Sequence, residues 1–368
     1  MSVDPAQKRL IRLVLFLCAV SSVVTAALVF CYQEEPMGLW DRIRSKLFTK
    51  AASSSSNDVE QPEMITVYDK FGRTLLVPKQ EWRQNVLPGQ IEEAWNDPAA
   101  LYQAIVMALN DGFYIEVLAA SERLLQIDDD QERSHVVRGI VLMKTGDLDG
   151  SKKILTKYID EHGATGTVLT NLAKVYAERD ESERAELTLW DGLKLDPNQE
   201  NGLSWWGAIH EERLGQQGFI DSMSKAATIP GSWRPQLWLA RKSLEQDRPE
   251  EAIRHYEAIL KVAADHGDVL MQISGDLGSH GCLDEILTLI LPVYDPEKHD
   301  VQTGLNILQA YMEKGDYILG KQLLQRMYAL NRPDIRDRLH YYAAEFEKLK
   351  DAAEPLPPAS DQQGTPVG

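Results

Sequence analysis

The chain contains 368 residues, of which 43% are hydrophobic and 26% charged, a composition typical of a globular protein that can build a sizeable core. Its net charge is −17, and because residues 1–33 contribute +2, the remainder of the chain sums to −19. This acidity argues against nucleic acid as the main partner, because phosphate binding requires a basic surface.

The first predicted element is a membrane-spanning helix over residues 13–32. These 20 residues carry no charge, and a helix of that length is about 30 Å long, which matches the hydrocarbon core of a bilayer. Three basic residues precede the run and Glu34 and Glu35 follow it, which predicts a cytoplasmic tail over residues 1–12. We therefore expect a single-pass protein of a bacterial inner membrane with a periplasmic C-terminal domain, although four basic residues between positions 42 and 50 favour the opposite orientation.

A cleaved signal peptide is the alternative interpretation of this segment. Ala26 and Ala27 supply small residues near a cleavage site. The apolar run nevertheless continues to Phe30, where a signal peptide has already become polar. An uncleaved anchor is therefore favoured.

Residues 33–62 are predicted to be a juxtamembrane segment and a serine-rich linker. Leu39, Trp40, Ile43 and Leu47 recur at helical spacing among basic residues, which is typical of a helix lying on lipid headgroups and equally of a plain linker with scattered apolar residues. Four consecutive serines at positions 53–56 indicate a flexible tether.

Residues 63–97 are predicted to form a β-hairpin followed by two short helices. The sequence ITVYDKFGRTLLVP alternates apolar and other residues on either side of a turn and ends at Pro78. Such a hairpin module is expected to cap the first exposed face of a helical array. A separate binding role for the hairpin is the alternative.

The rest of the chain repeats with a period of 33 or 34 residues, which decides the expected fold. A small or apolar residue marks the middle of the first helix in each unit, and a second marker follows 12 residues later. The first-helix markers are Ile105, Gly139, Ala173, Gly207, Ala240, Ser274 and Leu308, and the second-helix markers are Val117, Ser151, Ala185, Phe219, Ala252, Ile286 and Gly320.

One unit carries the pattern most fully. Within residues 166–199, the sequence NLAKVYAERDESERAELTLWDGLKLDP places Leu172, Ala173, Tyr176, Ala185, Leu189 and Pro197 at the spacings of the tetratricopeptide repeat (TPR). The chain therefore resembles the TPR family over residues 98–334. The resemblance implies an all-α, TPR-type α-solenoid of about seven helical hairpins. Residues 335–353 are predicted to be a C-terminal capping helix, and the proline-rich residues 354–368 a disordered tail.

Three units depart from the pattern. Phe219 and Ile286 replace the small second-helix residue in units four and six, and Leu308 replaces the small first-helix residue in unit seven. Small markers allow two helices to approach closely, so we expect the local packing of these units to differ.

The TPR resemblance also implies where a partner would bind. First helices line the concave groove in this family, which assigns a partner-binding role to Tyr102, Val136, Ile140, Thr170, Asn171, Lys174, Trp205, Leu237, Trp238, Arg241, Met271, Leu305 and Gln309. This mixed surface suits an extended or helical peptide with apolar anchors. It lacks the Lys and Asn pattern by which some relatives hold a C-terminal carboxylate.

Five tryptophans lie within about 50 residues of one another. They are Trp190, Trp205, Trp206, Trp233 and Trp238. Packing between units is the favoured interpretation, and a binding hot spot is the alternative.

No motif indicates catalysis or a metal site. A HEERL segment at residues 210–214 lacks the second histidine of a zinc-protease helix. His280 and Cys282 have no third ligand nearby, and with Cys18 and Cys31 in the apolar run, no disulfide framework is expected in the soluble part. We expect no cofactor, no metal and no small-molecule substrate.

The sequence therefore predicts a non-enzymatic, membrane-anchored scaffold that binds partner proteins or peptide segments in its groove. The alternatives are a chaperone-like assembly factor for envelope or secretion proteins, an enzyme with a buried acid–base pair in the groove, and a structural spacer whose groove is filled by its own chain.

Overall fold

The computed structural model describes residues 63–68 and 74–353. The predicted membrane helix over residues 13–32, the linker over 33–62 and the tail over 354–368 lie outside the described residues. Within the described part of the chain, every helix is too short or too polar to cross a bilayer.

The predicted hairpin module is present. Strands β1 (Met64–Tyr68) and β2 (Thr74–Pro78) pair antiparallel, with Ile65 opposite Val77. Helices α4 (Lys79–Asn85) and α5 (Leu87–Ala94) follow directly. Ile65 and Leu87 are buried and join one hydrophobic core with Leu101 and Ile105 of the next helix, so the module covers the first helix pair.

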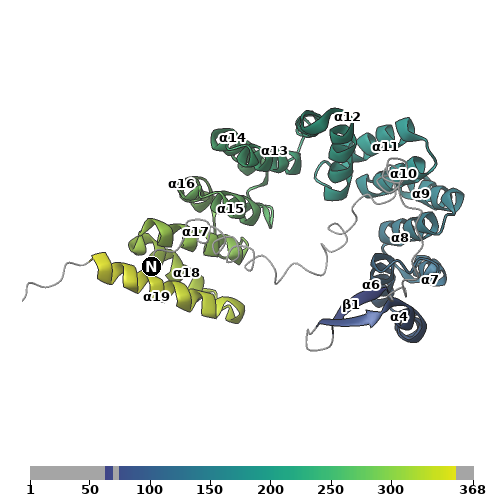
Figure 1. Cartoon of the computed structure of the whole chain (residues 1–368), viewed down its shortest axis with the longest axis horizontal. Helices are drawn as coiled ribbons and strands as arrows, with labels where there is room; N and C mark the ends of the chain where they lie inside the picture. Colours follow the sequence, from purple (N-terminus) through teal and green to yellow (C-terminus); the bar gives the residue numbers. More distant parts are fainter. Residues whose placement is uncertain (1–62, 69–73, 354–368) are drawn as a thin grey trace, which may run out of the picture. The chain divides into compact units, whose positions relative to one another are not determined.

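Past this module the described chain is helical and divides into two compact units, residues 63–235 and 236–353. Figure 1 shows the helices following one another as antiparallel pairs within each unit. In the first unit they are α6 (Pro98–Asn110), α7 (Leu118–Ile127), α8 (Gln131–Lys144), α9 (Leu148–His162), α10 (Gly166–Glu178), α11 (Ser182–Leu195) and α12 (Glu200–Ala226).

The second unit continues the series from α13 (Arg234–Glu245), which begins at the boundary. Its remaining elements are α14 (Pro249–Ala263), α15 (Val269–Ser279), α16 (Leu283–Glu285), a π-helix (Ile286–Ile290), a 3₁₀ turn (Leu291–Val293), α17 (Val301–Lys314), α18 (Tyr317–Ala329), a second 3₁₀ turn (Pro333–Ile335) and α19 (Arg336–Ala353).

The predicted repeat is confirmed as an all-α array of TPR-like helical hairpins. The seven first-helix markers lie in α6, α8, α10, α12, α13, α15 and α17. Small residues do bring paired helices together: a Cβ on Gly139 of α8 would lie 2.9 Å from Leu155 of α9. Ser151, also on α9, donates a hydrogen bond from its hydroxyl to the Gly139 carbonyl at 2.7 Å.

Units four and six depart from regular hairpins, as expected. In unit four, α12 consists of two helical stretches that meet without a loop at Gly215, where φ is 64° and ψ is −158°, a conformation that glycine adopts without steric penalty. In unit six, the second helix becomes α16, a π-turn and a 3₁₀ turn. Pro292 explains this break, because its ring has no N–H to donate and clashes with the preceding helical turn.

Unit seven forms a regular pair despite its leucine marker. Leu308 is fully buried in α17, and α18 supplies Gly320 as the small residue. Phe346 of the predicted capping helix α19 packs over that glycine. The capping helix is confirmed, with Leu339 and Phe346 buried.

Candidate functional site

An open groove of about 560 Å³ lies on the first unit. Helices α6, α8 and α10 contribute to its lining, as does the segment over residues 196–201 that leads into α12. The residues lining the groove are Tyr102, Leu109, Asn110, Asp130, Glu132, Arg133, Val136, Val137, Ile140, Thr167, Thr170, Asn171, Lys174, Asp196, Asn198, Gln199, Glu200, Asn201 and Arg234.

The apolar part of the groove comes from α6 and α8. Val136 and Ile140 are four residues apart on α8, so they share one face of the helix. Tyr102 of α6 joins them, and the guanidinium of Arg133 lies 4.9 Å from the centre of its ring. That guanidinium also donates two hydrogen bonds to Asp128, at 2.9 and 2.7 Å. Arg133 therefore links the Tyr102 ring to Asp128.

The polar part of the groove is fixed by hydrogen bonds between consecutive repeats. Thr170 of α10 donates to Gln199 at 2.7 Å. The Asn198 carboxamide oxygen accepts from the backbone N–H groups of Trp233 and Arg234, at 2.8 and 3.0 Å. Arg234 in turn pairs with Glu200 at 3.1 Å. These bonds hold the 196–201 segment against the start of the next helix.

Asn171 of α10 presents an unsatisfied acceptor. Its Nδ2 donates to the Thr167 carbonyl at 2.9 Å, whereas its Oδ1 is buried and has no hydrogen-bond partner among the described residues. A buried polar atom without a partner costs about 1–3 kcal/mol. A bound molecule that donates a hydrogen bond there would recover this cost.

The carboxylates dominate the electrostatics at one end of the groove. Asp130 caps the N-terminus of α8 by accepting from the backbone N–H of Arg133, and Glu132 accepts from the Thr165 hydroxyl at 2.9 Å. Burial first, and then the negative charges of Glu132 and Asp130, raise the pKa of Tyr158 above its ordinary value. Hydrogen bonding to Asp128 is the main cause that raises the pKa of Arg133.

The structure brings six of the thirteen predicted binding residues into this groove. They are Tyr102, Val136, Ile140, Thr170, Asn171 and Lys174. Their predicted role in binding stays a prediction. Sequence reasoning missed the loop and cap residues Asp130, Gln199 and Arg234, because the repeat register describes helix faces and says nothing of the loops between them.

Three predicted groove residues outside this groove are buried. Leu237, Leu305 and Trp205 are 1%, 2% and 9% exposed, which is comparable to Val136, Thr170 and Asn171 in the groove, so their predicted role in binding stays a prediction.

Two further predicted residues of the second unit are engaged within the chain. Arg241 of α13 pairs with Asp276 of α15 at 2.8 Å and donates to Gln272. Gln309 donates to Glu313 and accepts from the Tyr342 hydroxyl at 3.1 Å. The remaining two, Trp238 and Met271, are half-buried.

The packing interpretation of the tryptophan cluster is confirmed for its central members. Trp206 and Trp233 are 2% and 4% exposed. The Trp206 indole N–H donates to the Ser222 carbonyl, and its ring lies 4.9 Å from that of Trp190. The ammonium of Lys225 lies over both of these rings, at 4.3 and 5.1 Å.

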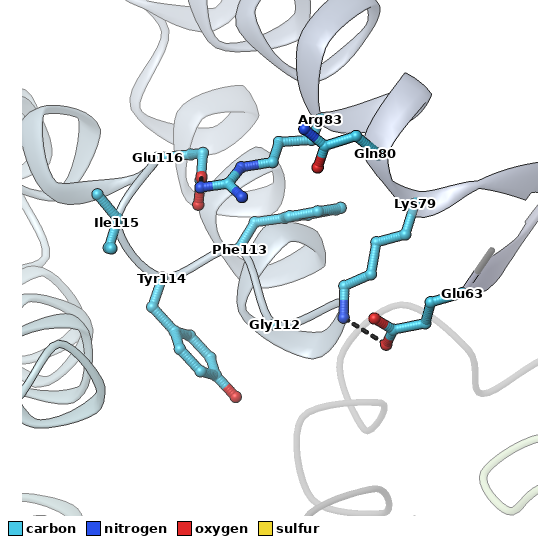
Figure 2. A pocket seen from close by; sticks show the side chains of 9 residues that line it. All are labelled: Glu63, Lys79, Gln80, Arg83, Gly112, Phe113, Tyr114, Ile115 and Glu116. Atoms are coloured by element: carbon cyan, nitrogen blue, oxygen red, sulfur yellow. Dashed lines mark hydrogen bonds and ion pairs between the residues drawn. The ribbon is translucent and has the colours of Figure 1, made fainter. Parts of the chain in front are cut away.

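A second cavity, of about 420 Å³, lies between the hairpin module and the α6–α7 turn (Figure 2). Lys79 pairs with Glu63 at 2.6 Å, and Arg83 pairs with Glu116. The buried ring of Phe113 lies between these two pairs in Figure 2. The Arg83–Glu116 pair and the ammonium of Lys79, 5.7 Å from the centre of the Phe113 ring, join the module to the first repeat, which favours the capping role.

The sequence segments that partly resemble metal sites have no additional ligands near them in the described residues. Within residues 63–68 and 74–353, no three His, Cys, Asp or Glu side chains are placed to hold a metal ion. His280 Nδ1 lies 2.9 Å from the Asp276 carbonyl, and the thiol of Cys282 forms no disulfide and lies 4.0 Å from the His280 carbonyl.

No protein-family model and no curated protein match this chain. Among solved structures, it is similar to a TPR protein of Thermus thermophilus (16% identity, 49% of this chain and 98% of the other, TM-score 0.31). It is also similar to YrrB, a TPR protein with an unusual peptide-binding site (14% identity, 50% of this chain and 94% of the other, TM-score 0.28). A third similar structure is a TPR protein from Parabacteroides merdae (12% identity, 68% of this chain and 98% of the other, TM-score 0.29). These similarities are too distant to carry an argument, so the fold rests on the helix pairs themselves.

Proposed function

We propose that this protein is an interaction scaffold that binds a peptide segment of a partner protein in the groove formed by α6, α8 and α10. The observation that carries the proposal is the groove itself: a volume of about 560 Å³, apolar side chains on one wall and a hydrogen-bonded polar wall opposite. Pockets of this size and composition bury ligands of several hundred cubic ångströms.

The rigidity of the groove supports binding of an ordered segment. Arg133 is fixed by Asp128 and Tyr102, and Thr170 is fixed by Gln199. Walls that are already in position lower the ordering cost of association. The binding residues belong to helices of consecutive repeats, so the site extends along the direction in which the repeats stack.

Photocrosslinking from inside the groove tests this proposal. In the full chain, p-benzoylphenylalanine replaces Thr167, an exposed residue that lines the groove. The matched control places it at Lys153, which is exposed on α9 and does not line the groove. We expect a discrete adduct from position 167 that is absent from position 153 and is lost when Ile140→Glu disrupts the apolar wall.

The pattern of adducts also separates the two kinds of binding protein. One stable partner supports a scaffold, and many unfolded clients support a chaperone-like factor. Equal adducts from both positions, or adducts unaffected by Ile140→Glu, would contradict binding in this groove.

We further propose that residues 13–32 anchor the protein in a bacterial inner membrane, with the groove on the periplasmic side. The uncharged run and the basic residues before it support this orientation. A pair of reporters fused after residue 60 tests it: periplasmic alkaline phosphatase activity is expected, and β-galactosidase activity would overturn the orientation.

A further inference from the structure

We infer that the groove formed by α6, α8 and α10 takes a basic peptide segment of a partner protein, one that donates a hydrogen bond to Asn171 and places a Lys or Arg side chain beside Asp130 and Glu132. This inference rests on the proposed function and adds the chemical class of the ligand.

The orientation of the Asn171 carboxamide sets the first requirement. Its Nδ2 donates to the Thr167 carbonyl at 2.9 Å, and flipping the group would bring two oxygens together. The remaining atom is therefore Oδ1, an acceptor that is buried and unpartnered among the described residues. Since Asn171 is 5% exposed and lines the groove, we assign the missing donor to a ligand that enters beside it. A peptide N–H or an ammonium N–H meets this requirement, and a carboxylate does not.

The ion pairs of the lining set the second requirement. Four carboxylates and three cations line the groove. Arg133 is held by Asp128, which stands outside the lining, and Arg234 is held by Glu200. Lys174 is also engaged within the chain. The groove therefore offers a ligand more negative charge than positive charge.

The exposed carboxylates lie where a long basic side chain would end. The Asp130 side chain is 52% exposed and its ion pair with Arg133 is long, at 4.0 Å, and the side chain of Glu132 is half-buried. Val136 lies four residues beyond Glu132 on the same face of α8. Lys and Arg side chains cover apolar surface with their methylene stems while the charged group reaches a polar edge. A basic side chain can therefore contact both the apolar surface at Val136 and the carboxylates of Asp130 and Glu132.

A random peptide library, displayed on phage and selected against the immobilised full chain in detergent micelles, provides the probe. The test variant is Asp130→Asn/Glu132→Gln, which removes two charges but keeps the helix cap and the hydrogen-bond acceptor for Thr165. The matched control is Asp160→Asn/Glu161→Gln, which removes two exposed charges from α9 of the same repeat. A third variant, Asn171→Leu, removes the unsatisfied acceptor at similar side-chain volume.

We expect the wild type and the α9 control to select peptides enriched in Lys and Arg. The affinity of a selected peptide, measured by fluorescence anisotropy, should fall roughly tenfold in Asp130→Asn/Glu132→Gln, as expected for two partly exposed ion pairs. Asn171→Leu should weaken basic and neutral peptides alike. Binding to the wild type should also weaken as salt concentration rises.

Selection of acidic or uncharged peptides that bind this groove would overturn the inference while leaving the proposed function intact. Selection of no groove-binding peptide would overturn both. The chain's own basic segment, residues 42–50, is the competing occupant that the test must exclude. If Arg42→Gln/Arg44→Gln/Lys46→Gln raises peptide affinity, the occupant is the chain's own segment, and the assignment to a partner protein is wrong.

Discussion

Replacing Gly320 with alanine would test whether small marker residues set the distance between packed helices. Gly320 lies in α18, at the second-helix marker of unit seven. A Cβ at this position would lie 2.6 and 2.9 Å from Cε1 and Cε2 of Phe346, and closer still to Cζ. Because Phe346 is fully buried in α19, its ring cannot move into solvent to relieve the clash.

The expected magnitude follows from two opposing effects. Alanine stabilises a helix by about 1 kcal/mol relative to glycine. Overpacking a filled core costs about 1–3 kcal/mol, and contacts this short against a buried ring place the cost near the upper end. We therefore expect Gly320→Ala to lower the free energy of unfolding by about 2 kcal/mol.

Urea unfolding of the full chain, followed by circular dichroism, measures this change. Gly275→Ala is the matched control, because it lies inside α15 and no atom approaches its Cβ position within 4 Å. That variant should be as stable as the wild type or up to about 1 kcal/mol more stable. Adding Phe346→Leu to Gly320→Ala should recover part of the loss through a coupling of about 1 kcal/mol. If Gly320→Ala and Gly275→Ala unfold alike, close approach does not set this packing.

Three further changes test interactions away from the marker positions. Arg241→Met should lower the free energy of unfolding by about 2 kcal/mol near pH 8 and by less near pH 5, as measured by urea unfolding. The reason is that burial already raises the pKa of Asp276 and the loss of Arg241 raises it further, so the unpaired carboxyl is protonated at the lower pH. Equal losses at both pH values would contradict this. Asn198→Ala removes three hydrogen bonds and should lower stability by about 2–3 kcal/mol, whereas a loss below about 0.5 kcal/mol would show that the linked segments do not depend on it. Burial lowers the pKa of His210 and His255 below 6.5, so the unfolded chain binds more protons than the folded chain as pH falls through that range, and stability decreases. The double variant His210→Gln/His255→Gln should lose less stability than the wild type between about pH 7.5 and 5.5. An equal loss of stability would assign the effect to other groups.

The helix pairs were predictable from the sequence because small residues recur at a regular spacing. A step of 33 or 34 residues between small positions specifies two helices and two turns, and the markers Gly139 and Ala173 both lie fully buried where a neighbouring helix approaches. The hairpin was predictable for a similar reason, since its two-residue alternation places Ile65 toward the core.

The breaks in the array depend on single residues that a periodic pattern averages out. Gly215, whose backbone is not helical, joins the two helical stretches of α12 without a separate loop. Pro292 ends the second helix of unit six in a 3₁₀ turn. Both residues can be read from the sequence, but their effect on the helix depends on their exact position within it. The repeat register alone does not fix that position to within one helical turn.

The groove was only half predictable, because register fixes the direction of a side chain but not its partner. Arg241 was placed correctly on a first helix, yet Asp276, 35 residues later, neutralises it. Gln309 was also placed correctly, and Tyr342, 33 residues later, contacts it. In a repeat array, each groove position faces the corresponding position of the next unit, so a complementary residue one period away closes the site. Asn171 shows the opposite outcome: its Oδ1 faces no donor from the following repeat, and a position left unsatisfied by the next unit is where a ligand gains most by binding.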